Sequence, residues 1–312
     1  MALVEQHRLR GDSVLVLANP ASTRIGRLRE RHQDHPHVRI RSAALHEYGS
    51  LTVDEPFDVF YHLAWTGGQC RDDWEVNLHS ALATRSAVEL AHRLGCRAFI
   101  GAGSQAECGP QQAPLSDRTW CTPVNPFGVA KLSALFIARQ RAHELGLRFN
   151  WARILSVYGP YDGEGTLVVS TIRRILRGEP LAFTAGSQTW DFLYADDAAR
   201  AMQLVADRGK PDAIYTIGSG QPTPLRDFIR ALTAKFGVSA DPYLGHQRIP
   251  SGSPTYLVAD ITRLREEFGW EPVVDVEEGL DRTIQYCVAS EGRGPSPGLH
   301  PPSGVPLSRM PQ

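Results

Sequence analysis

The chain lacks the features that mark membrane, secreted and nucleic-acid-binding proteins. Its 312 residues contain no apolar run near the roughly 18 residues that cross a bilayer, and no signal-peptide pattern at the N-terminus. Lys and Arg number 33 and Asp and Glu 34, so the net charge of -1 argues against broad binding to DNA, RNA or anionic membranes. We therefore expect a soluble cytoplasmic protein without a nucleic-acid or membrane partner.

Cysteine is scarce and does not follow a metal-binding pattern. The five cysteines are an odd number in a long chain and show neither CxxC spacing nor His/Cys ligand spacing. We expect reduced thiols and no bound metal. Apolar residues make up 42% of the chain and charged residues 21%, which indicates a well-packed core.

Short apolar runs alternate with longer segments of helical periodicity. The spacing of apolar residues predicts helices over Asn77–Leu94 and Phe127–Leu145. The alternation predicts an α/β fold, a Rossmann-like doubly wound parallel sheet, with functional residues at the carboxyl ends of the strands. Four runs predict buried strands: Ser13–Ala18, Asp58–Ala64, Arg97–Gly103 and Phe149–Leu155.

After residue 160 the elements become shorter, which predicts a smaller C-terminal lobe. The patterns predict helices over Thr166–Leu176 and Asp196–Val205 and a short strand over Asp191–Tyr194. Two further helix starts are predicted from capping signals: Thr223 before Pro224, and Asp275 with Glu278. In residues 290–312, 14 of 23 are Pro, Gly or Ser, which indicates a disordered tail.

Six motifs occur in an order that resembles one protein family. They are FDVFYHLAW at 57–65, GSQAECG at 103–109, PFGVAK at 126–131, RILSVYGP at 153–160, WDFLYADD at 190–197 and FGWEP at 268–272. Over residues 1–288 the chain resembles the extended short-chain dehydrogenases that modify nucleotide sugars, the NAD-dependent epimerase/dehydratase family. The resemblance implies a dinucleotide-binding domain at 1–160, a substrate lobe at 161–289 interleaved with the sheet, and a tail at 290–312.

The resemblance implies catalytic positions at Ser104, Phe127 and Lys131. In the family, the aromatic residue four positions before the lysine is a tyrosine, whose phenol passes the proton that accompanies hydride transfer. Phe127 has no proton to pass. Lys131 is expected to hold the cofactor ribose, and Ser104 to hydrogen-bond a substrate carbonyl or hydroxyl. Stand-in proton donors are Ser104 itself, a water, a substrate hydroxyl, or the side chains of Cys108, Cys121 and Tyr158.

The resemblance also implies binding residues for a cofactor and a nucleotide sugar. Asn19, Arg24, Ala64 and Lys131 are the expected cofactor contacts. Neutral Asn19 stands where NAD-selective members place an acid, and Arg24 follows it, so NADP is favoured over NAD. The substrate contacts are expected at Trp65, Glu107, Ser156 and Trp190.

The N-terminus departs from the family pattern. The family opens with a strand and a glycine-rich turn that binds the cofactor pyrophosphate at a helix N-terminus. Here Met1–Gln6 already predicts the helix that follows this turn, and Gly11–Leu15 the second strand. Two accounts stay open: the strand and turn lie upstream of Met1, or the protein has lost them.

Three functions are consistent with these residues. The first is an NADP- or NAD-dependent 4-keto-sugar reductase or epimerase with an altered proton donor. The second is a biosynthetic enzyme of the same fold that no longer uses the tyrosine or the dinucleotide. The third is an inactive homologue that binds a nucleotide sugar or a partner. The resemblance further implies a homodimer through the helices at Asn77–Leu94 and Phe127–Leu145.

Overall fold

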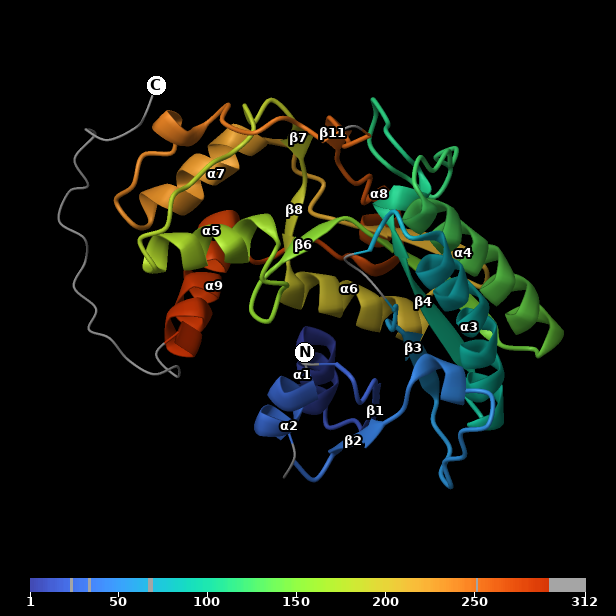
Figure 1. Cartoon of the computed structure of the whole chain (residues 1–312). Coiled ribbons are helices and arrows are strands. Elements are labelled where there is room, and N and C mark those ends of the chain that lie inside the picture. Colours follow the sequence, from blue (N-terminus) through green and yellow to red (C-terminus); the bar gives the residue numbers. More distant parts are fainter. Residues whose placement is uncertain (23–24, 33–34, 67–69, 251, 292–312) are drawn as a thin grey trace.

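The computed structural model describes residues 1–22, 25–32, 35–66, 70–250 and 252–291 (Figure 1). Arg24 and nearly all of the predicted tail lie outside the described residues. In the first half of the chain the elements are α1 (Ala2–Arg10), β1 (Val14–Ala18), α2 (Ile25–His32), β2 (Val38–Ser42), η1 (Leu45–Glu47), β3 (Val59–His62), α3 (Trp74–Arg93), β4 (Ala98–Ser104), η2 (Gln105–Glu107), α4 (Pro126–Glu144) and β5 (Arg148–Ile154).

The second half contributes one strand to the central sheet and builds the smaller lobe. Its elements are β6 (Ser156–Tyr158), α5 (Leu167–Leu176), β7 (Thr189–Trp190), β8 (Phe192–Tyr194), α6 (Ala195–Arg208), β9 (Ala213–Ile217), β10 (Thr223–Pro224), α7 (Leu225–Ala234), η3 (Asp241–Tyr243), β11 (Tyr256–Leu257), α8 (Thr262–Phe268) and α9 (Val276–Glu291).

The central sheet has four parallel strands in the order β3-β4-β5-β9. Strands β1 and β2 pair in parallel with each other but form a separate two-stranded sheet. The predicted α/β fold with a parallel sheet is thus confirmed. The sheet, however, is divided between β1 and β3.

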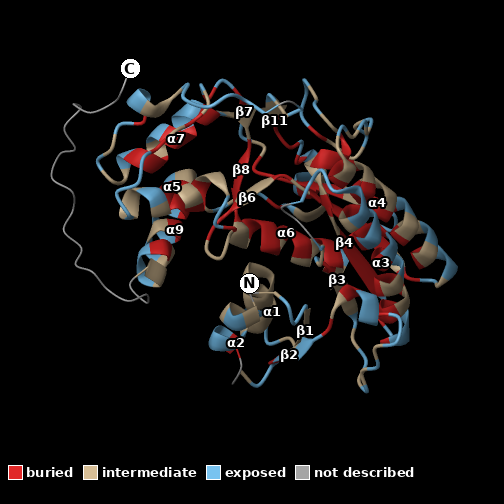
Figure 2. Cartoon of the chain, in the orientation of Figure 1, coloured by how far each residue is buried: buried red, intermediate tan, exposed pale blue. Residues whose placement is uncertain are grey.

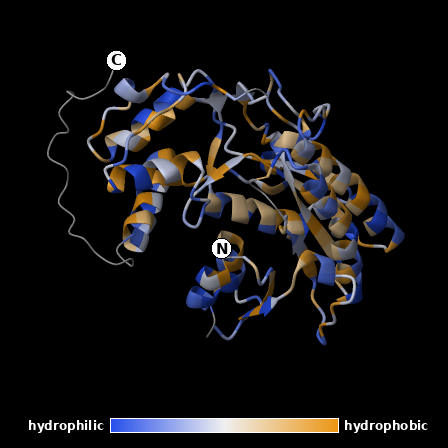
Figure 3. Ribbon diagram, in the orientation of Figure 1, coloured by the Kyte–Doolittle hydropathy of each residue, from blue (hydrophilic) through white to orange (hydrophobic). Residues whose placement is uncertain are grey.

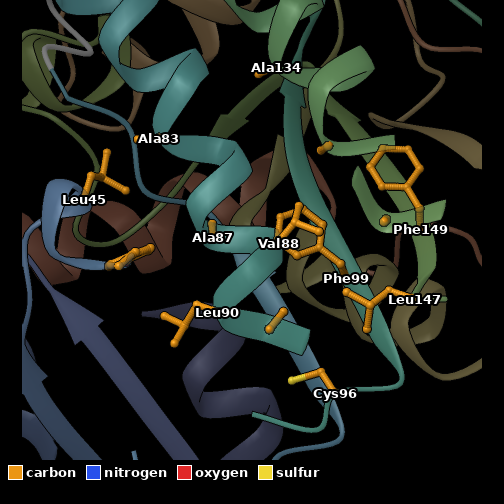
Figure 4. Close-up of a cluster of buried hydrophobic side chains, with 14 of the residues drawn as sticks. Leu45, Ala83, Ala87, Val88, Leu90, Cys96, Phe99, Ala134, Leu147 and Phe149 are labelled. Atoms are coloured by element: carbon orange, nitrogen blue, oxygen red, sulfur yellow. The ribbon is translucent and has the colours of Figure 1, made fainter. Parts of the chain in front are cut away.

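Helices cover both faces of the central sheet, because successive strand residues point to opposite faces. Phe99 of β4 packs with residues of α3 and α4, whereas its neighbour Ile100 packs with residues of α6. Figure 4 shows Phe99 beside Val88 of α3, with Phe149 of β5 in the same cluster. Buried Ala side chains on α3 and α4 let these helices pack closely against each other and the sheet.

The contrast between inner and outer helices is visible in burial and hydropathy. Helix α6 is largely buried between the sheet and α1, whereas α2 is mostly exposed and hydrophilic (Figures 2 and 3). In the smaller lobe, α5, α7 and α9 surround a third cluster, in which Phe192 and Phe228 stack with ring centroids 3.6 Å apart.

Local capping explains where the site helices begin. Asn125 Oδ1 accepts the Gly128 N–H at 2.8 Å, and Pro126 opens α4. Asp275 Oδ1 accepts the Glu278 N–H at 2.8 Å before α9, in agreement with the predicted cap. The predicted cap at Thr223 is wrong: Thr223 pairs with Trp190 in a strand, and Pro224 precedes α7 without a side-chain cap.

Candidate functional site

The expected catalytic residues meet at the carboxyl end of the central sheet. Ser104 is the last residue of β4, and Phe127 and Lys131 lie on the first turns of α4. Trp65 follows β3 and reaches the same place, where its ring meets that of Phe127 edge-to-face with centroids 5.9 Å apart. The structure therefore brings together side chains of α4 and of the segment after β3, beside the backbone of β4.

Lys131 is a buried cation with two partners. Its Nζ donates to the Ala102 carbonyl at 2.9 Å and lies 3.8 Å from the centre of the Trp65 ring. The residue is 7% exposed, and burial lowers the pKa of Lys131 to about 8, although the charge of Glu107 opposes the shift. A cation–π contact stabilises the charged form, while burial brings both protonation states within reach near neutral pH.

Phe127 is buried within this cluster and has contacts on several sides. It is buried, its N–H donates to the Arg71 carbonyl at 3.0 Å, and the Arg71 guanidinium lies 5.2 Å from the centre of its ring. The next residue, Gly128, lies so close to η2 that an added Cβ would be 2.3 Å from the Ala106 carbonyl oxygen. The sequence motifs did not single out Arg71, because it lies outside them.

Glu107 is an interior residue, whereas Ser104 is half-buried. Glu107 is fully buried, and its carboxylate accepts from the Ser104 N–H at 2.6 Å and the Trp151 indole at 3.0 Å. It also pairs with Arg153 at 3.2 Å. These donors occupy the carboxylate, so the predicted contact of Glu107 with a sugar hydroxyl finds no support in its surroundings.

The stand-in proton donors lie in different places. Tyr158 belongs to the cluster of the smaller lobe, where its hydroxyl donates to the Val276 carbonyl at 3.4 Å and burial raises its pKa. Cys108 and Cys121 touch each other, with their sulfurs 3.6 Å apart. The hydrogen bond with Cys108 and the charge of Arg153 lower the pKa of Cys121, against the effect of its own burial.

The remaining predicted binding residues lie around the same edge of the sheet or in the smaller lobe. Asn19 is exposed after β1, and its Oδ1 accepts the Ala21 N–H at 3.0 Å. Ala64 follows β3 and packs on the core. Ser156 opens β6, and the Trp190 indole donates to the Pro254 carbonyl at 3.0 Å.

The cysteines are unpaired in this structure. All five cysteines are free thiols. None of the helices within the described ranges is long and apolar enough to span a bilayer. The same ranges contain no cluster of three or more His, Cys, Asp or Glu side chains suited to a metal ion.

Comparison with known proteins identifies the family of the chain. The profile of the NAD dependent epimerase/dehydratase family matches residues 2–218, which is more than half of the chain. The chain belongs to this family. An uncharacterized UDP-glucose epimerase from Bacillus subtilis (strain 168) is 25% identical over 250 residues, 76% of this chain and 78% of that protein. A UDP-glucuronate 4-epimerase from Thermodesulfobacterium geofontis (strain OPF15) is 26% identical over 244 residues, 75% of this chain and 74% of that protein.

A solved structure of this epimerase/dehydratase family shares the fold. It is a tyrosine-to-phenylalanine mutant of UDP-glucuronic acid 4-epimerase from Bacillus cereus, in complex with UDP-4-deoxy-4-fluoro-glucuronic acid and NAD. The TM-score is 0.80 at 22% identity, covering 93% of this chain and 95% of that chain. At this identity the likeness establishes the fold alone.

The cofactor of the epimerase/dehydratase family does not fit this conformation of the side chains. The expected ribose ligand, Lys131, has its ammonium covered by the Trp65 ring and bonded to the Ala102 carbonyl. A ribose would reach Lys131 only after the Trp65 side chain turned away.

Proposed function

We propose that the chain acts on a nucleotide sugar, as a 4-keto-sugar reductase or an epimerase that uses NADP or NAD, with an altered proton donor. Membership of the family and the two curated relatives, both UDP-sugar epimerases by name, support the substrate class. The single observation that carries the altered donor is the position of Lys131. Its Nζ lies 5.9 Å from the centre of the Phe127 ring, beside the place of the family phenol.

In this proposal, Lys131 and Ser104 together take the role of the family tyrosine. The Lys131 ammonium holds the proton, and its pKa of about 8 suits a group that gives and takes protons near neutral pH. Ser104 Oγ accepts the Ala106 N–H at 3.2 Å. A serine hydroxyl that accepts one hydrogen bond still has a hydrogen to donate, so Ser104 orients the sugar oxygen.

The binding roles follow from the same proposal. Asn19 and Ala64 lie at the carboxyl ends of β1 and β3, where cofactors of doubly wound sheets bind. Neutral Asn19 favours NADP over NAD. Ser156 and Trp190 remain the proposed substrate contacts of the smaller lobe, and Trp65 has a double role, as a substrate contact and as the cover of Lys131.

A second candidate is a protein of this family that binds a nucleotide sugar without a dinucleotide. The observation that favours it is the stack of Trp65 on Lys131 at 3.8 Å, which occupies the ribose ligand. Such a protein is either an enzyme of changed chemistry or an inactive binding homologue.

Calorimetric titration separates these candidates. The full chain is titrated with NADPH, NADH, UDP-glucose, UDP-glucuronic acid and dTDP-glucose, and the products are analysed by chromatography. Dinucleotide binding with slow turnover supports the first candidate, and Lys131→Ala must then weaken NADPH binding. Sugar-nucleotide binding without any dinucleotide favours the second, and the product assay then distinguishes enzyme from binding protein.

We also propose that the protein forms a homodimer through α3 and α4. Large apolar side chains on these helices are exposed: Leu78 is 41%, Leu82 66% and Phe136 57% exposed. Exposed apolar residues gathered on neighbouring helices are typical of an interface. A second copy of the same helix pair would cover them.

A further inference from the structure

The fold holds the thiols of Cys108 and Cys121 in contact. Their sulfurs are 3.6 Å apart, although the two residues are 13 positions apart in the chain. Cys108 is fully buried at the end of η2, and Cys121 is half-buried in the loop before α4. A disulfide bond has sulfurs about 2.05 Å apart, so closing this pair requires a movement of about 1.5 Å.

Backbone contacts keep the two cysteine segments side by side. The Cys108 carbonyl accepts the Thr122 N–H and the Thr122 hydroxyl, each at 3.2 Å. It also accepts a hydrogen bond from Gln111 Nε2 at 2.7 Å. Gly109 lies so close to this loop that an added Cβ would be 2.1 Å from the Thr122 carbonyl oxygen. The two sulfurs therefore meet because the backbones that carry them are packed together.

The surroundings of the pair make its two thiols unequal. Arg153 Nη2 donates to Cys121 Sγ at 3.5 Å, and a positive charge beside a sulfur favours the thiolate. The hydrogen bond with Cys108 and the charge of Arg153 lower the pKa of Cys121, against the effect of burial. The same hydrogen bond, together with burial, raises the pKa of Cys108. Cys121 is thus the sulfur that carries the negative charge, and it is also the less buried of the two.

The other three cysteines lack this combination of features. Cys96 and Cys287 are buried, and burial raises the pKa of each thiol. Cys70 is exposed. In the described part of the chain, the only hydrogen bond between two sulfurs joins Cys108 and Cys121.

We propose that Cys108 and Cys121 form a dithiol site that reacts with hydroperoxides, in which Cys121 attacks the peroxide and Cys108 resolves the product. The Cys121 thiolate attacks one peroxide oxygen, the O–O bond breaks and hydroxide leaves, so that Cys121 becomes a sulfenic acid. The Cys108 sulfur then attacks the Cys121 sulfur. The S–O bond breaks, an S–S bond forms, and the oxygen leaves as water with the Cys108 proton. Once the hydroxide takes up the proton that Cys121 had lost, two thiols have been oxidised to a disulfide and one hydrogen peroxide reduced to two waters.

The disulfide would cross-link two segments of the candidate site. Cys108 follows η2, which begins directly after Ser104, and Cys121 lies shortly before Asn125, the cap of α4. The same helix carries Lys131. Oxidation therefore modifies the connection between the end of β4 and α4. This inference does not depend on the proposed catalytic function.

Peptide mapping of the 312-residue chain after treatment with hydrogen peroxide tests the proposal. The exposed Cys70 is first replaced (Cys70→Ser), so that it forms no links between molecules. Trypsin cleaves after Arg118, between the two cysteines of the site. A disulfide therefore joins peptides 98–118 and 119–131 into one species, about 2 Da lighter than their sum. We expect this species to form and to disappear on reduction with dithiothreitol.

The rate of thiol loss and two variants distinguish the roles of the sulfurs. We expect the thiol of Cys121 to disappear at least about tenfold faster than those of Cys96 and Cys287. In Cys108→Ser the sulfenic acid of Cys121 has no resolving thiol, so we expect dimedone, which reacts with sulfenic acids, to label Cys121. In Cys121→Ser we expect Cys108 to remain an unlabelled thiol, because it is buried and its pKa is raised.

Three outcomes overturn the proposal. In the first, no linked peptides form, whether Cys121 stays reduced or becomes a sulfinic acid. In the second, the linked species forms no faster in the folded chain than in concentrated urea, which shows that the fold does not promote the reaction. In the third, dimedone labels Cys108 of Cys121→Ser as fast as it labels Cys121 of Cys108→Ser. The first two outcomes are measured with both cysteines in place, so they decide the matter even if a variant fails to fold.

Discussion

The Lys131 ammonium lies 3.8 Å from the centre of the Trp65 ring, although Trp65 follows β3 and Lys131 lies in α4. This contact covers Lys131, the expected ribose ligand. The Trp65 side chain must therefore move before a ribose reaches Lys131. Trp65 is itself held by a hydrogen bond from its indole to Asn77 Oδ1 at 3.0 Å. The position of the Trp65 side chain therefore determines whether Lys131 is accessible to a ligand.

Replacing Trp65 with alanine is expected to strengthen NADPH binding. The substitution uncovers Lys131 and removes a cation–π contact worth about 0.5–2 kcal/mol, so the affinity gain is about twofold to thirtyfold. Calorimetric titration measures it. Trp120→Ala, at a tryptophan that is 82% exposed, is the matched control. Equal or weaker NADPH binding by the Trp65 variant would show that the indole does not cover the site.

Burying the charged Lys131 side chain lowers the free energy of unfolding, and this cost is expected to disappear as pH rises. The folded-state pKa of about 8 lies below the ordinary value of 10.5, so below pH 8 the buried charge destabilises the fold by about 3 kcal/mol relative to its neutral form. Between pH 8 and 10.5 the unfolded chain binds more protons than the folded one, and stability rises.

Urea unfolding of the natural chain and of Lys131→Met at pH 7 and pH 10 checks this expectation. Comparing the two proteins at each pH cancels the titration of the tyrosines and cysteines. The difference in unfolding free energy between them is expected to shift in favour of the natural chain at the higher pH. A difference that stays constant would contradict a lowered Lys131 pKa.

Restoring the phenol at Phe127 is expected to raise any reductase or epimerase activity. A positioned acid or base contributes about 10²–10⁴ in rate, and Lys131 already supplies part of this contribution, so we expect a gain of about tenfold to a hundredfold in kcat for Phe127→Tyr. Phe136→Tyr, at an exposed residue of the same helix, is the control. If a folded, cofactor-bound Phe127→Tyr protein shows no gain, the altered proton path is wrong.

Neutralising Glu107 is expected to destabilise the fold strongly. Arg153 and Glu107 are 1% and 0% exposed, and removing one partner of a buried pair costs about 3–5 kcal/mol. Chemical unfolding of Glu107→Gln measures the loss. Glu89→Gln breaks pairs with Arg85 and Arg141 that remain partly exposed, and is expected to cost less than about 1 kcal/mol. Equal losses in the two variants would argue against an interior role for Glu107.

Charging the outer faces of α3 and α4 is expected to produce monomers. Leu82→Glu with Phe136→Glu places carboxylates at two exposed apolar positions, where a dimer would bury them unpaired. Light scattering after size-exclusion chromatography measures the mass. Val273→Glu, at another exposed apolar residue away from these helices, is expected to leave the dimer intact. A natural chain that is already monomeric at all concentrations would exclude the dimer.

The sequence alone predicted most of the fold and the place of the site. Apolar periodicity and capping are local properties, so the strands β1, β3, β4 and β5, the helices α3 to α6 and the start of α9 could be predicted from neighbouring residues. Strand β2 was not predicted. The same holds for the substitution at Phe127, because it departs from a contiguous motif.

Only the tertiary structure decided what these side chains do. The stack of Trp65 on Lys131, the enclosure of Glu107 by Trp151 and Arg153, and the contact of Tyr158 with Val276 in the smaller lobe join residues that are 44 or more positions apart. No local pattern encodes such contacts, because they depend on how strands and helices pack.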